Sequence, residues 1–154
     1  MTAATFAAMS QYVQQSDLSG LIPAEFFTQA LDDVNAGVTD NAIFTQIATD
    51  ASGVIDGLLG TRVSVPFQPD ENGAYPPFVF NACKKLVAEQ LYKRRGVTDD
   101  KNPFTKECDM LRDLMNKMAL GTVPIDPSIQ RKDPSASIIT ERARTVPRDN
   151  IISC

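Results

Sequence analysis

Ala51-Ser-Gly-Val-Ile-Asp-Gly-Leu-Leu-Gly-Thr-Arg-Val-Ser-Val-Pro-Phe67 is the stretch that decides the fold. Its first half completes a helical pattern that leaves one apolar face, formed by Ile43, Ile47, Ala51, Val54, Ile55 and Leu58. After Gly60 the pattern changes to alternation, with Val63, Val65 and Phe67 on one side of an extended chain. We therefore expect a core helix that turns abruptly into a short edge strand or projecting arm.

Length and composition are those of a single domain. The chain has 154 residues, of which 43% are hydrophobic, and can bury one sizeable core. Its 15 basic and 19 acidic residues give a net charge of −4, which argues against a surface built to neutralise nucleic-acid phosphates. No apolar run approaches the roughly 18 residues of a membrane span, and the first residues lack the basic region of a signal peptide. We expect a soluble, cytosolic protein.

Histidine, the commonest general base and metal ligand in proteins, is missing from the sequence. Its absence removes Ser-His and Cys-His nucleophiles and most zinc sites. Cys83 and Cys108 fall on apolar faces of expected helices and Cys154 is the last residue, so we predict buried free thiols rather than a disulfide. The Asp32/Asp33 and Asp99/Asp100 pairs lack the spacing of a calcium loop. We expect no enzyme activity, no metal and no cofactor.

Four further helices are expected around the core helix, which begins after Thr39 or Asp40. Their predicted ranges are Phe6 to Gln15, Pro23 to Leu31, Phe78 to Arg95 and Pro103 to Gly121. The predicted inward residues of the last two helices are Val79, Cys83, Leu86, Val87, Leu91, Phe104, Cys108, Leu111, Met115 and Met118. The sequence thus predicts a mainly α fold, a small helical bundle of four to five helices with a short extended arm and a long extended C-terminal tail.

The expected domain division follows from a change of composition after Gly121. Residues 1–121 form the predicted bundle with its arm at 62–77, and residues 122–154 form an extended tail interrupted by prolines. Eight aliphatic residues are too few to offset the entropy of ordering this tail, so we expect it to bind another chain. The candidate partner-binding residues are Ile138, Ile139, Arg142, Arg144, Val146, Ile151 and Ile152.

A second set of candidates belongs to contacts between subunits. An alternating arm needs a pairing partner, and a helical bundle offers no sheet. The candidate interface residues are Asp56, Arg62, Val63, Val65 and Phe67. For Asp56 the alternative is a solvent-facing carboxylate. The basic helix end at residues 93–95 could contact DNA or an acidic partner, or simply complement the helix dipole.

Several segments together resemble a known family. They are Ile55-Asp56-Gly57-Leu58, Arg62-Val63-Ser64-Val65-Pro66, Pro76-Pro77, Leu91-Tyr92-Lys93-Arg94-Arg95, the helix Lys106 to Leu120, and Met118-Ala119-Leu120-Gly121-Thr122-Val123. In this order and spacing, over roughly Thr39 to Val123, they resemble the head-tail connector (adaptor, or head completion) proteins of tailed bacteriophages, particularly the Mu-like type. The tail of this chain is longer than in the shorter Mu-like pattern.

The resemblance implies a structural function. It implies a ring of identical subunits, typically a dodecamer, that docks beneath the portal protein and above a downstream neck or tail completion protein. Genomic DNA would pass through the lumen without sequence-specific binding, and the protein would lie in the virion neck after synthesis in the host cytoplasm. The resemblance also implies that a C-terminal extension reaches the portal or a neighbouring subunit. The alternative is a small helical DNA-associated regulatory protein, against which the acidic composition counts.

Overall fold

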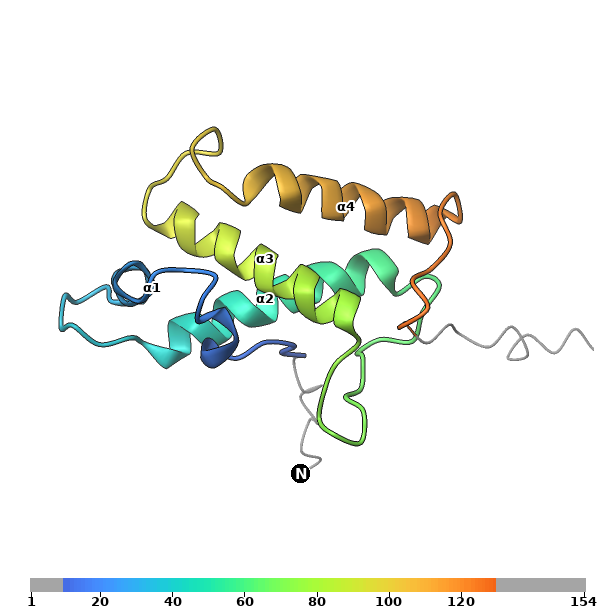
Figure 1. The fold of residues 1–154 in the computed structure, drawn as a ribbon, viewed down its shortest axis with the longest axis horizontal. Helices are drawn as coiled ribbons and strands as arrows, with labels where there is room; N and C mark the ends of the chain where they lie inside the picture. The colour runs from blue at the N-terminus through green and yellow to red at the C-terminus, as the bar shows by residue number, and fades with distance from the viewer. Residues whose placement is uncertain (1–9, 130–154) are drawn as a thin grey trace, which may run out of the picture.

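This computed structural model describes residues 10–129 of the chain (Figure 1). These residues contain four α-helices and one short 3-10 helix, joined by loops. The elements are η1 (Gln15–Leu18), α1 (Ala24–Leu31), α2 (Asn41–Leu59), α3 (Pro77–Arg94) and α4 (Thr105–Leu120). Within residues 10–129 there is no strand, and one isolated bridge joins Ser19 to Ile22. The predicted mainly helical fold is confirmed.

The central element is α3, which packs against α1, α2 and α4 (Figure 1). Because it is covered on several sides, its apolar residues do not form one stripe. Its buried residues are Val79, Ala82, Cys83, Leu86, Val87, Ala88, Glu89 and Leu91. All five inward residues predicted for this helix are among them, so that prediction is confirmed. The buried Glu89 was not expected.

The start of α2 is confirmed, but its buried face is rotated from the predicted one. The Asp40 carboxylate accepts a hydrogen bond from the backbone N–H of Ala42 at 2.8 Å and caps the helix. The buried residues are Phe44, Ile47, Ala48, Ala51, Ser52, Ile55 and Leu59, whereas Val54 is 42% exposed. The face turns because the N-terminal segment lies beside it, where the Tyr12 backbone N–H donates to Ser52 Oγ at 3.2 Å. The prediction that Val54 points inward is wrong.

The last helix, α4, follows the predicted pattern. Cys108, Met115 and Met118 are buried, and Phe104 and Leu111 pack against them. Gly121 ends the helix in the left-handed conformation with φ 80°, which glycine adopts without a steric penalty.

The predicted first helix is wrong where the structure describes it. Residues 10–14 are extended rather than helical, and the remainder of the prediction, Phe6 to Met9, lies outside the described residues. Tyr12 and Val13 are nonetheless buried in the main core. The extended backbone lets Tyr12 hydrogen-bond to α2, an interaction that a helix at this place would not allow.

The segment after α2 does not project as an arm. Val63 and Phe67 are buried in the core, and Val65 is partly buried against it. The chain turns through hydrogen bonds from the backbone N–H groups of Arg62 and Val63 to the Leu59 carbonyl. The expectation of a strand here is therefore wrong, because the alternating apolar side chains pack on their own bundle. The following loop to Pro77 is exposed, as predicted, over most of its length.

The folded body continues past the predicted boundary at residue 121. Ile125 and Ile129 are buried in the core, and Val123 packs against it. The prediction that the whole of 122–154 stands apart from the bundle is therefore wrong for residues 122–129. The seven candidate tail residues, Ile138, Ile139, Arg142, Arg144, Val146, Ile151 and Ile152, lie outside the described part.

Candidate interaction surfaces

The predicted subunit-interface residues are largely occupied within the subunit itself. Tyr12 OH donates a hydrogen bond to Asp56 Oδ1 at 2.5 Å and accepts one from the Phe67 backbone N–H at 3.0 Å. Ser10 Oγ donates to the other Asp56 oxygen at 2.7 Å. Both Asp56 carboxylate oxygens are thus engaged within the subunit, and the side chain is partly exposed. It joins the N-terminal segment, α2 and the segment after α2.

The Tyr12 ring is the centre of this junction. It makes edge contacts with the rings of Phe67 and Tyr75, at centroid distances of 5.7 and 5.0 Å. Burial raises the pKa of the Tyr12 hydroxyl, and its hydrogen bond to the Asp56 carboxylate raises it further. The hydroxyl therefore remains a proton donor at any physiological pH. Sequence analysis missed this role because it assigned Tyr12 to a helix.

Arg62 follows the C-terminal end of α2 and remains on the surface. Its Nη1 donates a hydrogen bond to the Met118 carbonyl at 3.1 Å, close to the end of α4. A Cβ placed on Gly121 would lie 3.1 Å from the same guanidinium nitrogen. Arg62 therefore marks a surface where the C-terminal ends of α2 and α4 meet.

The basic helix end at Lys93, Arg94 and Arg95 is paired within the chain. Arg94 binds Asp33 at 2.6 Å and the Ala30 carbonyl at 3.1 Å, and Arg95 Nη2 donates to the Gln29 side chain at 2.7 Å. These contacts tie the end of α3 to α1 and the loop after it. The cations hold the fold together, which agrees with neither a pure dipole effect nor a dedicated DNA contact.

Glu89 is a buried carboxylate with two cationic partners. Arg112 Nη2 lies 2.5 Å from its Oε2, and Lys93 Nζ lies 3.2 Å from its Oε1. The hydrogen bond to Glu89 raises the pKa of the Arg112 guanidinium. Because the opposite charges lie within the same cluster, we interpret these ion pairs as a link between α3 and α4 rather than as a reactive site. The four-residue spacing of Glu89 and Lys93 on one helix is the sequence signal from which this ion pair could have been predicted.

Both described cysteines are free and buried, as predicted. Burial raises the pKa of the Cys83 thiol to about 11 and that of the Cys108 thiol to about 12, which makes both poor nucleophiles. No group of three or more potential metal ligands occurs in residues 10–129. Asp32 of the first aspartate pair accepts hydrogen bonds from the backbone N–H groups of Ala36 and Gly37, and Asp33 pairs with Arg94.

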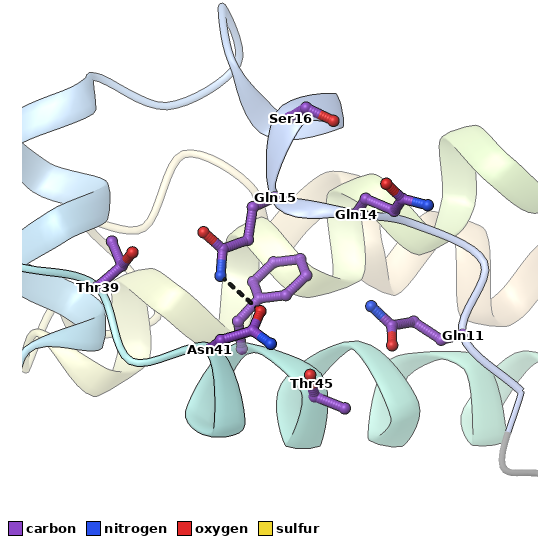
Figure 2. Close-up of a pocket in the computed structure, with 8 residues that line it drawn as sticks. Gln11, Gln14, Gln15, Ser16, Thr39, Asn41 and Thr45 are labelled. Carbon is purple, nitrogen blue, oxygen red and sulfur yellow. Dashed lines mark hydrogen bonds between the residues drawn. The ribbon is translucent and has the colours of Figure 1, made fainter.

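A polar hollow lies between the N-terminal segment and the start of α2. It has a volume of about 700 Å³ and is lined by Gln11, Gln14, Gln15, Ser16, Thr39, Asn41, Phe44 and Thr45. Figure 2 shows the side chains of Gln11 and Gln15 on the N-terminal segment above Asn41 and Thr45 on α2. Gln15 Nε2 donates to Asn41 Oδ1 at 3.0 Å. Amides and hydroxyls line this hollow, and no charged side chain does, so it suits another polypeptide better than a phosphate.

Five large apolar side chains are exposed among the described residues: Val34, Val38, Val54, Met110 and Leu120. Val34 and Val38 lie in the loop between α1 and α2, where Val38 directly precedes Thr39, a residue that lines the hollow. Leu120 ends α4. No sequence pattern drew attention to the two valines, because they lie in a break between helices. No helix in residues 10–129 is long and apolar enough to cross a membrane.

Comparison with known proteins gives one family. Residues 12–140 match the family described as Bacteriophage Mu, Gp36. This match takes in nearly the whole described body and most of the 154-residue chain. No curated protein matches the chain.

Proposed function

The chain belongs to the bacteriophage Mu Gp36 family, and from this membership we propose that it is a head-tail connector. In this proposal identical subunits form a ring, with twelve as the expected number, beneath the portal protein. The ring extends the DNA channel and joins the capsid to a downstream neck or tail completion protein. The observation that carries the proposal is the family match over residues 12–140, since it assigns the folded body to a bacteriophage protein.

The described body has the properties that a structural subunit needs. Three of its titratable side chains, Tyr12, Asp56 and Glu89, are engaged in contacts between segments of the body. Such groups fix the relative positions of helices, which is what a structural subunit requires. We therefore propose a mechanical role and no enzymatic one.

Charge is unevenly distributed along the chain. Residues 10–129 contain ten lysines and arginines against sixteen aspartates and glutamates, a net charge of −6, whereas residues 130–154 contain five against three, a net charge of +2. An acidic body repels the phosphates of passing DNA, so the lumen would not bind the genome sequence-specifically. A basic, aliphatic tail is suited to a separate protein surface.

We assign portal binding to residues 130–154. The candidate contacts are Ile138, Ile139, Arg142, Arg144, Val146, Ile151 and Ile152. A ring presents many copies of this segment at once, so a weak contact for each subunit gives a strong attachment overall. The proposed place of the protein is accordingly the neck of the virion.

A DNA-associated regulator receives no support from the basic helix end. Arg94 and Arg95 are bound to Asp33, the Ala30 carbonyl and Gln29, and Lys93 lies between Glu89 and Asp99. Breaking these contacts to bind phosphates would cost stability. The connector is the function that the observations favour.

The test measures binding of the full-length chain to the portal protein of the same phage. Replacing Ile138 and Ile139 together by aspartate removes apolar contact and adds two negative charges to the tail. The matched control replaces Ser135 and Ser137 by aspartate, which adds the same charge without removing an aliphatic side chain. The proposal expects a loss of portal binding for the isoleucine variant alone. Equal binding by both variants and the unmodified chain would refute the assignment of the tail.

A further inference from the structure

Two surfaces at opposite ends of the body expose large apolar side chains. The first, here called the valine end, comprises the loop with Val34 and Val38 and the adjoining hollow of Figure 2. The second, the leucine end, comprises Leu120 and the turn after α4 with Arg62 beside it. Figure 1 shows the loop between α1 and α2 and the end of α4 at opposite ends of the longest axis.

The loop of the valine end is held in a defined shape. The Asp32 carboxylate accepts hydrogen bonds from the backbone N–H groups of Ala36 at 2.9 Å and Gly37 at 2.6 Å. The Asp40 backbone N–H donates to the Leu31 carbonyl at 3.0 Å and closes the loop. Yet the loop leaves Val34 84% and Val38 65% exposed. A preorganised loop loses little entropy on binding, which favours its use as a contact.

The hollow beside this loop supplies the polar part of a contact surface. Its amide side chains, among them Gln11, Gln15 and Asn41, both donate and accept hydrogen bonds and so match main-chain groups. Stable interfaces combine an apolar centre, poor in charge, with a polar rim. The two valines and the uncharged hollow together have this composition.

The leucine end offers the complementary features. Leu120 is 80% exposed at the last position of α4. The turn after α4 and Arg62 already bind the Lys117 and Met118 carbonyls, so the carbonyls of Ala119 and Leu120 are the ones that can accept hydrogen bonds from amide side chains. The segment from Ala119 to Ile125 contains no charged residue.

Electrostatics favours a contact between these two ends over other surfaces. Two copies of a body with a net charge of −6 repel each other, so they come together most easily where charge is low or complementary. The valine end is flanked by Asp32, Asp33 and Asp40, of which Asp33 is paired with Arg94. The leucine end carries Arg62, so an end-to-end contact brings this cation towards the acidic loop.

We propose that the valine end of one copy binds the leucine end of the next copy. Leu120 then packs against Val34 and Val38, and the amides of the hollow bind the main chain of the turn after α4. A contact between two different surfaces generates a ring when the rotation closes, unlike a two-fold contact, which stops at a dimer. The inference rests on the proposed ring of identical subunits and names the surfaces that join them.

The test is disulfide cross-linking between two full-length variants, both carrying Cys154→Ser. One also carries Val38→Cys and the other Leu120→Cys. The native cysteines Cys83 and Cys108 are fully buried and do not compete. Mixing the two variants in equal amounts under oxidation should move about half of the protein from the 16.8 kDa monomer to a mixed dimer on a non-reducing gel, because a random ring places unlike neighbours at half of the contacts of each variant. Each variant alone should give little dimer.

The matched control replaces Leu120→Cys by Met110→Cys, since Met110 is 71% exposed but belongs to neither end. A 38–120 product no greater than the 38–110 product overturns the inference, and so does a dominant 38–38 or 120–120 product. If the unmodified chain binds the portal as a ring while the 38–120 pair fails, the proposed function stands and this inference falls. If the pair cross-links but the chain does not bind the portal, the reverse holds.

Discussion

Replacing Tyr12 by phenylalanine tests whether the N-terminal segment is an integral part of the fold. The change removes only the hydroxyl, which donates to Asp56 at 2.5 Å and accepts from the Phe67 backbone N–H at 3.0 Å. The Phe67 N–H is buried and loses its acceptor, and the Asp56 carboxylate keeps only the hydrogen bond from Ser10. A buried group left without its partner costs about 1–3 kcal/mol, so two weakened groups predict a loss of about 2–4 kcal/mol.

The assay is urea unfolding of the full-length chain followed by circular dichroism. The expected loss lowers the urea midpoint without changing the slope, because the folded surface is unchanged. Tyr92→Phe is the matched control. The Tyr92 ring stacks on Phe26 at a centroid distance of 4.3 Å, and its hydroxyl makes no hydrogen bond to the residues that the structure describes. The control should change the free energy of unfolding by less than about 0.5 kcal/mol. Equal midpoints for Tyr12→Phe and the control would refute the role given to the hydroxyl.

Three further predictions concern other parts of the core. Ile129→Ala should lower the free energy of unfolding by about 2–4 kcal/mol in the same urea assay, because residues 122–129 belong to the body; no change would restore the boundary at residue 121. Glu89→Gln should cost about 3 kcal/mol by leaving its guanidinium partner unneutralised, whereas Glu107→Gln, at an exposed ion pair, should cost under about 1 kcal/mol; similar losses would contradict the assigned burial. Cys83 and Cys108, with pKa values raised to about 11 and 12, hold few thiolates at pH 8 and should react with a thiol reagent roughly 100-fold more slowly in the folded chain than in urea; equal rates would contradict their burial.

The helices could be predicted where local signals and tertiary packing agree. A cap at Asp40, one of the two predicted positions, the helix end at Gly121 and the apolar spacing of α3 and α4 all appear in the structure as expected. Each of these signals acts within a few residues, so the sequence alone contains it. The predicted inward residues of α3 and α4 were correct for the same reason.

Predictions failed where a residue's role depends on a distant partner. An apolar alternation ending at Phe67 indicates an extended segment but not what covers it, and here the cover is Tyr12, 55 residues earlier in the chain. The N-terminal segment that contains Tyr12 also lies beside α2, where it rotates the buried face of that helix and leaves Val54 exposed. Ile125 and Ile129 follow prolines in a stretch without periodicity, so nothing local shows that they return to the core.

The central claim is that the chain forms a connector ring and that its residues 130–154 bind the portal. One measurement tests both parts together. Native mass spectrometry of the full-length chain mixed with the portal protein of its phage reports the number of subunits and their binding together. We predict a closed ring, with twelve copies as the expected number, bound to the portal and lost when Ile138 and Ile139 are replaced by aspartate. A chain that stays monomeric and unbound in the presence of the portal would contradict the account.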